Sequence, residues 1–230
     1  MQVIFDHIAS LLVASVVLLI FAVLQLRGSQ SLTETSIHQI VYSDAINAGS
    51  MLQRDLENMR TEEQTAEAIA RGVYSGGMAY SCMMTSNGDT TQVLTFPTLA
   101  DPEGVGALAD PMDAPVQLVS YVLEPLADSV AVDRGASIEY FPLHRINRLV
   151  GGTFTGASKA NVIAFNVGLA SRGSVTFATG SMNCPTDLAK VRFEIKTAID
   201  GVTHVTGDQR STSRLNLSRY ATTVDLTNWE

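Results

Sequence analysis

The sequence has little of what small folds use for covalent or metal cross-links. Only two of its 230 residues are cysteine, Cys82 and Cys184, too few for a disulfide scaffold or a zinc ribbon. Its four histidines are scattered along the chain without the spacing of a zinc site. We therefore predict no metal ion and no cofactor. The cysteines are compatible with one disulfide bridge in an oxidising compartment or with two buried thiols. Both alternatives stay open, because a sequence does not show proximity.

Motifs that carry enzyme chemistry are also missing. There is no G-x-S-x-G turn, and "GGTFTGASK" at 151–159 lacks the Gly-Lys-Ser/Thr order of a phosphate-binding loop. An Asn-x-Ser glycosylation triplet at 216–218 is interpreted as a chance match, because such triplets are common. No residue stands out as catalytic, and the sequence predicts no enzyme.

The connector between Leu99 and Pro115 is rich in carboxylates, which suit hard cations such as calcium. They belong to Asp101, Glu103, Asp110 and Asp113. Their spacing does not match an EF-hand loop, so we interpret the connector as a solvated loop rather than a cation site. The whole chain has a net charge of −8. An acidic body repels phosphates, so no nucleic-acid partner is predicted.

A long run without charged residues lies near the start of the chain. Between Asp6 and Arg27 there is no Asp, Glu, Lys or Arg. A secretory signal peptide is disfavoured, because the residues before this run include Asp6 and no basic residue, and no A-x-A cleavage site precedes Arg27. As a helix, Ile8 to Leu26 would span about 28 Å, close to the hydrocarbon thickness of a bilayer. We expect residues 1–27 to form a hydrophobic helix that is able to cross a membrane.

The next segment, residues 28–71, predicts an amphipathic continuation of that helix. No proline precedes Pro97, so a helix can run without interruption towards Arg60, with Gly28 and Gly49 as weak points. Apolar residues recur at steps of three and four and make one stripe. They are Ile37, Val41, Ala45, Ala48, Leu52, Leu56 and Met59. A stripe of this kind is typical of a helix that packs on its own domain.

From residue 72 onwards the pattern changes to short β-like runs separated by Gly, Asp and Pro. In "KVRFEIKTAI", Val191, Phe193 and Ile195 alternate with charged residues, as in a strand with one buried face. Further candidate strands are Met78–Met84, Gln92–Phe96, Gln117–Leu123, Ser137–Phe141, Asn161–Val167 and Val175–Ala178. The predicted fold class is α+β, with a long N-terminal helix packed on an antiparallel sheet and a β-rich head domain at 72–230.

Four pieces of the chain resemble a known family. They are "FDHIASLLVASVVLLIFAVLQL", "AINAGSMLQRDLENM", "LAKVRFEIKTAIDG" and "RYATTVDLTN". Together they are similar to the minor pilins of type IV pili and the pseudopilins of type II secretion systems, particularly the larger J-like (PilW-like) members. The resemblance implies a pilin-like fold and a structural filament subunit. It also implies that the helix sits in the inner membrane before assembly and in the core of an extracellular or periplasmic filament afterwards.

Two features depart from the family pattern. No leader ending in glycine is visible, and Phe5 stands where the family has a glutamate, if Met1 is the first residue. If Met1 is removed, Asp6 takes that fifth position. In the family this carboxylate pairs with the N-terminal amine of the neighbouring subunit, and the resemblance gives Asp6 that role. The alternative is an interfacial charge that marks the membrane boundary.

The resemblance also implies a set of assembly residues on the N-terminal helix. They are Phe5, Asp6, Leu11, Ala14, Leu18, Phe21 and Ala22. Small residues among them permit close helix approach. The expected partners are copies of the chain or other pilins, and the pilus or secretion machinery. Two alternatives stay open: a membrane-anchored, non-polymerising extracytoplasmic binding domain or envelope-complex subunit, and an anchored hydrolase.

Overall fold

The structure is a computed structural model that describes residues 2–76, 82–108, 110–133, 138–201 and 214–226. It divides into two compact units, Met1–Ile40 and Val41–Glu230. The sequence placed a boundary after residue 27, where the apolar run ends. The boundary between the units comes later, within the same helix.

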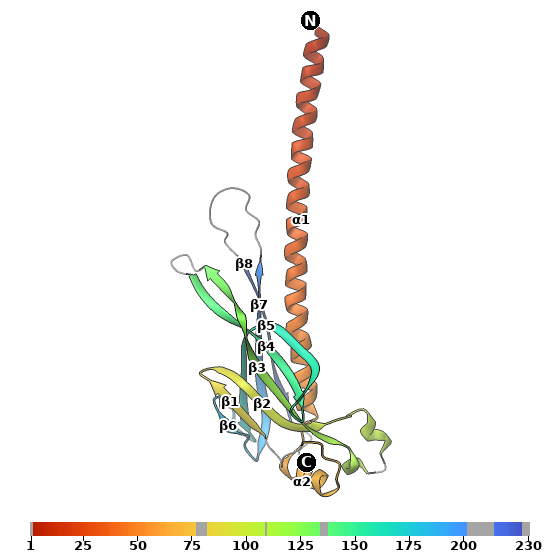
Figure 1. Cartoon of the computed structure of the whole chain (residues 1–230), viewed down its shortest axis with the longest axis vertical. Helices are drawn as coiled ribbons and strands as arrows, with labels where there is room; N and C mark the ends of the chain where they lie inside the picture. Colours follow the sequence, from red (N-terminus) through yellow and green to blue (C-terminus); the bar gives the residue numbers. More distant parts are fainter. Residues whose placement is uncertain (1, 77–81, 109, 134–137, 202–213, 227–230) are drawn as a thin grey trace. The chain divides into compact units, whose positions relative to one another are not determined.

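Helix α1 extends from Gln2 to Glu57 (Figure 1). Its 56 residues contain no proline, so no backbone donor is lost along it. Gly28 and Gly49, the expected weak points, do not interrupt it. Packing accounts for the glycine at position 49, because an added Cβ would lie 2.1 Å from Cδ1 of Tyr220. That glycine therefore lets a sheet residue approach the helix backbone.

The sequence predicts that the helix continues through residues 28–71, but in the structure it is interrupted after Glu57. After Glu57 the chain joins the sheet, where the N–H of Arg60 donates to the carbonyl oxygen of Pro97 at 2.9 Å. A new helix, α2, spans Glu62–Ala70. It starts with a capping box in which Thr61 and Gln64 exchange side-chain and backbone hydrogen bonds, both 3.1 Å long. The cap stabilises a separate helix start.

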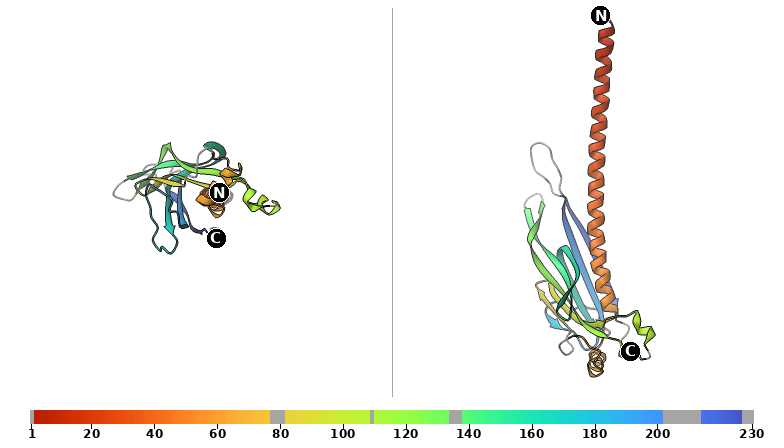
Figure 2. Two further views of the ribbon diagram at one scale, coloured as in Figure 1. Left: turned by 90° about the horizontal axis from the view of Figure 1, so that it is seen from below. Right: turned by 45° about the vertical axis from the view of Figure 1, so that its right-hand side comes forward.

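The strands form one antiparallel sheet (Figures 1 and 2). Their order in the sheet is β6-β1-β2-β3-β4-β5-β7-β8. Their bounds are β1 Met83–Asn87, β2 Thr90–Leu99, β3 Val116–Asp133, β4 Ile138–Val150, β5 Thr153–Ser171, β6 Met182–Asn183, β7 Leu188–Gly201 and β8 Arg214–Asp225. Two short 3₁₀ helices, η1 Gly104–Ala107 and η2 Pro111–Asp113, lie in the connector between β2 and β3. The α+β prediction is confirmed.

The sheet curls so that β2 approaches β5, although the two strands are not neighbours in the strand order. The buried hydroxyl of Thr91 accepts a hydrogen bond from the N–H of Val167 at 3.1 Å. The curl encloses the main core, which α1 closes from one side with Ala48, Leu52 and Leu56. These three belong to the stripe that the spacing predicted.

Most predicted strands coincide with parts of longer observed ones, and two differ. Val175–Ala178 is no strand, because Ala178 makes only an isolated bridge with Leu169 and Val175 is 92% exposed. Part of the first predicted strand, residues 78–81, lies outside the described residues. In the described part of that run, β1 begins at Met83.

Candidate functional site

The first candidate is the apolar segment of α1. Leu11–Ser29 is long and apolar enough to cross a membrane, with a mean hydropathy of 2.3 and none of its residues buried. The large apolar side chains from Leu11 to Leu26 are 44% (Val23) to 70% (Leu18) exposed. They occupy every side of the helix, as in a helix surrounded by lipid or by other helices.

The predicted assembly residues lie on this helix. Leu11, Ala14, Leu18, Phe21 and Ala22 are all exposed. Phe5 and Asp6 belong to α1, but their side chains lie outside the described part of the chain. The assembly residues whose side chains the structure describes are therefore all apolar and exposed.

Further along, the same helix becomes part of the second unit and packs on the sheet. Tyr220 on β8 lies against Gly49, and its hydroxyl donates to Oε1 of Gln53 at 2.9 Å. Ala45, Ala48 and Leu52 are at most 2% exposed. This half of the helix is a structural component of the head domain.

A polar cluster joins α1 to the middle of the sheet. Oδ2 of Asp55 accepts from the Tyr121 hydroxyl at 2.6 Å and from Nε of Arg148 at 2.7 Å. Oδ1 of Asp55 accepts from Nη2 of Arg148 at 3.2 Å. The side chains of Arg148 and Asp55 are only 16% and 12% exposed. The pair is therefore held in a poorly solvated place, where each charge requires the other.

Burial and charge shift the pKa values of this cluster. Burial, reinforced by the charge and hydrogen bond of Asp55, raises the pKa of Tyr121 above its usual range. For Arg148, burial acts to lower the pKa, but the hydrogen bonds and charge of Asp55 outweigh it and raise the pKa. Arg148 thus stays charged and Tyr121 stays a neutral donor. Neither residue is predicted from the sequence, because both lie far from Asp55 in the chain and no motif marks them.

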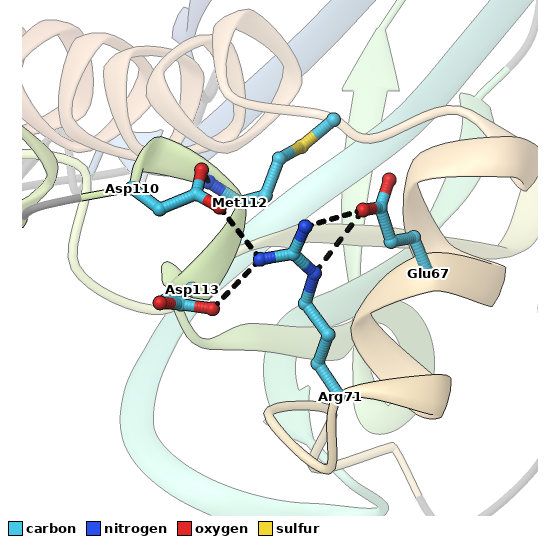
Figure 3. A network of polar contacts seen from close by, with 5 residues as sticks. All are labelled: Glu67, Arg71, Asp110, Met112 and Asp113. Atoms are coloured by element: carbon cyan, nitrogen blue, oxygen red, sulfur yellow. Dashed lines mark hydrogen bonds and ion pairs between the residues drawn. The ribbon is translucent and has the colours of Figure 1, made fainter.

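The acidic connector has cationic partners within the chain. Nη1 of Arg71, next to α2, donates to Asp110 at 2.7 Å and to Asp113 at 2.9 Å, and Nη2 donates to Glu67 at 2.6 Å (Figure 3). The N–H of Met112 and the Arg71 guanidinium lower the pKa of Asp110. In turn, the hydrogen bonds that the Arg71 side chain donates to Asp110, Asp113 and Glu67 raise the pKa of Arg71.

The remaining connector carboxylates are engaged as well. Oδ1 of Asp101 accepts from the N–H of Gly104 at 3.1 Å. Glu103 pairs with Arg54 of α1 at 2.7 Å, with both side chains largely exposed. The connector is thus fastened to both helices by ion pairs, and we interpret its carboxylates as structural.

Cys82 and Cys184 form a disulfide in the structure, with Cα atoms 5.3 Å apart. Next to it, the N–H of Cys184 donates to the carbonyl oxygen of Cys82 at 3.0 Å. The bridge joins β1 to the excursion between β5 and β7 that supplies β6. It therefore fastens one edge of the sheet.

No protein-family model matches the sequence, and no curated protein sequence matches it. Among solved structures, the chain is similar to a type IV-like pilin from Thermus thermophilus, with 10% sequence identity and a TM-score of 0.42. The match covers 82% of this chain and 97% of that chain. At this identity it transfers no residue role to the present chain.

Proposed function

We propose that this chain is a structural, non-enzymatic subunit of a type IV pilus-like filament. The observation that carries the proposal is the segment Leu11–Ser29, which is helical and unburied and carries large apolar side chains on every side between Leu11 and Leu26. Each large aliphatic or aromatic side chain contributes about 1.5–3 kcal/mol when it leaves water. A helix of this kind is stable only in lipid or among other apolar helices.

A filament uses both environments in succession. Before assembly the segment lies in the inner membrane, and in the filament it packs against the same segment of neighbouring subunits. Lipid is as apolar as these side chains, so the exchange from lipid to helix neighbours costs little hydrophobic energy. A contact between two different faces of identical subunits then repeats without closing, which generates an open helical polymer.

The second half of α1 distinguishes a filament subunit from a simple anchor. One helix supplies residues to both units without a proline or a loop, and Leu52 and Leu56 are core residues of the head. An anchor works equally well through a flexible linker. A filament subunit needs its core helix joined directly to its head domain, and α1 runs from the apolar segment into the head without a loop.

Asp6 is the proposed determinant of register. An ionised carboxylate in an apolar helix bundle is costly unless it is paired, and the family resemblance names an N-terminal amine of the neighbouring subunit as its partner. Asp6→Ala is expected to prevent filament formation while the protein still enters the membrane. Asp6→Glu keeps the charge and is the matched control.

The test is electron microscopy of material sheared from cells that make the protein, with mass spectrometry of its N-terminus. Filaments that contain the chain and disappear in Asp6→Ala support the proposal. Normal filaments in Asp6→Ala would show that Asp6 does not set the register. If the wild-type protein stays in the membrane as monomers, the filament proposal is wrong, and an anchored, non-polymerising binding domain is the better account.

A further inference from the structure

A polar cleft of about 610 Å³ lies in the second unit, beside the Asp55 cluster. Its walls come from the last turns of α1, the end of β2, the start of β3, the end of β4, the start of β5 and the start of the acidic connector. The residues that carry the argument are Arg54, Asp55, Asp101, Glu103, Gln117 and Arg148. The volume is within the usual range for small-molecule sites. The cleft uses none of the assembly residues.

The charges in the cleft are already paired with each other. Two guanidinium groups and three carboxylates line it. At the base Arg148 contacts Asp55 at 2.7 Å, and at the rim Arg54 contacts Glu103 at 2.7 Å. The Asp101 carboxylate accepts from a backbone N–H. A charged ligand has to separate one of these pairs or face a like charge beside its own.

The paired groups keep unused hydrogen-bonding capacity. A guanidinium has five N–H donors and a carboxylate about four acceptor positions, whereas the Arg54–Glu103 pair uses one hydrogen bond. On the wall, the Gln117 amide makes no hydrogen bond to any residue that the structure describes, and it offers both donors and an acceptor. The cleft therefore presents donors and acceptors side by side.

We propose that the cleft binds a neutral, hydroxyl-rich ligand, a saccharide of one or a few rings. A hydroxyl group donates one hydrogen bond and accepts up to two. It can therefore bond to both members of an existing ion pair without separating them, which an ion cannot do. Met51, Leu99 and Pro102, which also line the cleft, supply apolar surface for the C–H face of a ring. This ligand site is separate from the filament function proposed above.

Binding is tested on the full chain in a sugar-free detergent by saturation-transfer NMR and by titration calorimetry. The probes are a panel of neutral mono- and disaccharides. Glucuronate, glucosamine and glycylglycine serve as the acidic, basic and zwitterionic comparators. We expect neutral saccharides to bind and the three charged probes to bind at least tenfold more weakly.

Two variants locate the binding in the cleft. Ser50→Trp places a bulky ring on the α1 wall and is expected to abolish saccharide binding. Ala66→Trp adds the same ring to an exposed position on α2 and leaves binding unchanged. Gln117→Ala removes one wall amide and weakens binding about fivefold, the usual effect of one hydrogen bond. Circular dichroism shows whether each variant is folded.

Loss of binding in Ser50→Trp or weakening in Gln117→Ala, with Ala66→Trp unaffected, supports the proposal. If no neutral saccharide binds, or if a charged probe binds more tightly, the proposal is wrong. Binding that persists at wild-type strength in a folded Gln117→Ala and a folded Ser50→Trp would place the ligand elsewhere and overturn it. Filament formation is assayed separately, because a chain that forms no filaments can still bind a saccharide in this cleft.

Discussion

Asp55 illustrates how one side chain connects a helix to a sheet. It is the acceptor for Tyr121 and for two N–H groups of Arg148, and its backbone carbonyl accepts from the Thr98 hydroxyl at 2.8 Å. Three strands, β2, β3 and β4, are thereby fixed to a single helical turn. Asp55 lies within "AINAGSMLQRDLENM", one of the pieces that carry the family resemblance, but the sequence does not show which distant residues contact it.

The raised pKa of Tyr121 predicts a loss of stability at alkaline pH. In the unfolded chain a tyrosine ionises near pH 10, whereas folding keeps Tyr121 neutral above that pH. Its contribution is complete below pH 10 and is lost as the pH rises further, towards the folded pKa. Tyr121→Phe should lower the free energy of unfolding by about 1 kcal/mol at pH 7 and make the decline above pH 10 shallower. Urea unfolding of the full chain in detergent, repeated from pH 7 to 11, measures both effects.

Tyr140→Phe is the control for this experiment, because Tyr140 is 66% exposed. It should leave both the stability at pH 7 and the slope above pH 10 as in the wild type. An alkaline decline that is just as steep in Tyr121→Phe would contradict the assigned cause. Tyr74, whose pKa burial also raises, accounts for part of the decline that remains.

Gly49 and Gly28 are a matched pair within one helix. At Gly49 an added Cβ meets the ring of Tyr220 at 2.1 Å, whereas at Gly28 nothing lies within 4 Å. Alanine favours a helix over glycine by about 1 kcal/mol, but overpacking costs about 1–3 kcal/mol. Gly49→Ala should therefore destabilise the head, and Gly28→Ala should not. The urea midpoints of the two variants decide this, and a stabilised Gly49→Ala would refute the packing role.

At the scale of elements, the disulfide joins parts of the chain that are far apart in sequence. Cys82 and Cys184 are separated by 102 positions. In the chain-entropy model, a loop of that length stabilises the folded state by up to about 4–5 kcal/mol. The double variant Cys82→Ser/Cys184→Ser should unfold at a markedly lower urea concentration than the wild type. It should also be insensitive to reductant, whereas the wild type shifts towards the variant when reduced. Equal midpoints with and without reductant in the wild type would contradict a stabilising bridge.

The elements also show what a sequence can and cannot predict. Helical spacing identified Leu52 and Leu56 as core residues, because burial of one helix face follows from a local period. The break before α2 was missed, although Thr61 and Gln64 carry a capping signal, because an apolar stripe hides a short interruption. The position of β6 beside β1 depends on a long-range pairing for which local pattern gives no signal.

At the scale of the whole molecule, our proposal makes function depend on the assembly residues of α1, which form one stripe, here called the assembly stripe. Leu11, Ala14, Leu18, Phe21 and Ala22 recur at steps close to one helical turn, which places them on one side of α1. Val16 lies on the opposite side. The sequence predicted this stripe only through the family resemblance, since an apolar run by itself does not say which side faces a neighbour.

Ala14→Phe and Val16→Phe separate membrane insertion from assembly. Phenylalanine is apolar, so both variants should enter the membrane as the wild type does. In a bundle, however, a ring at Ala14 prevents the close helix approach that small residues allow. We expect Ala14→Phe to reduce the yield of sheared filaments at least tenfold while its membrane level is unchanged, and Val16→Phe to retain filaments. Equal loss in both variants would mean that neighbours surround the helix on all sides, so that no single stripe directs assembly.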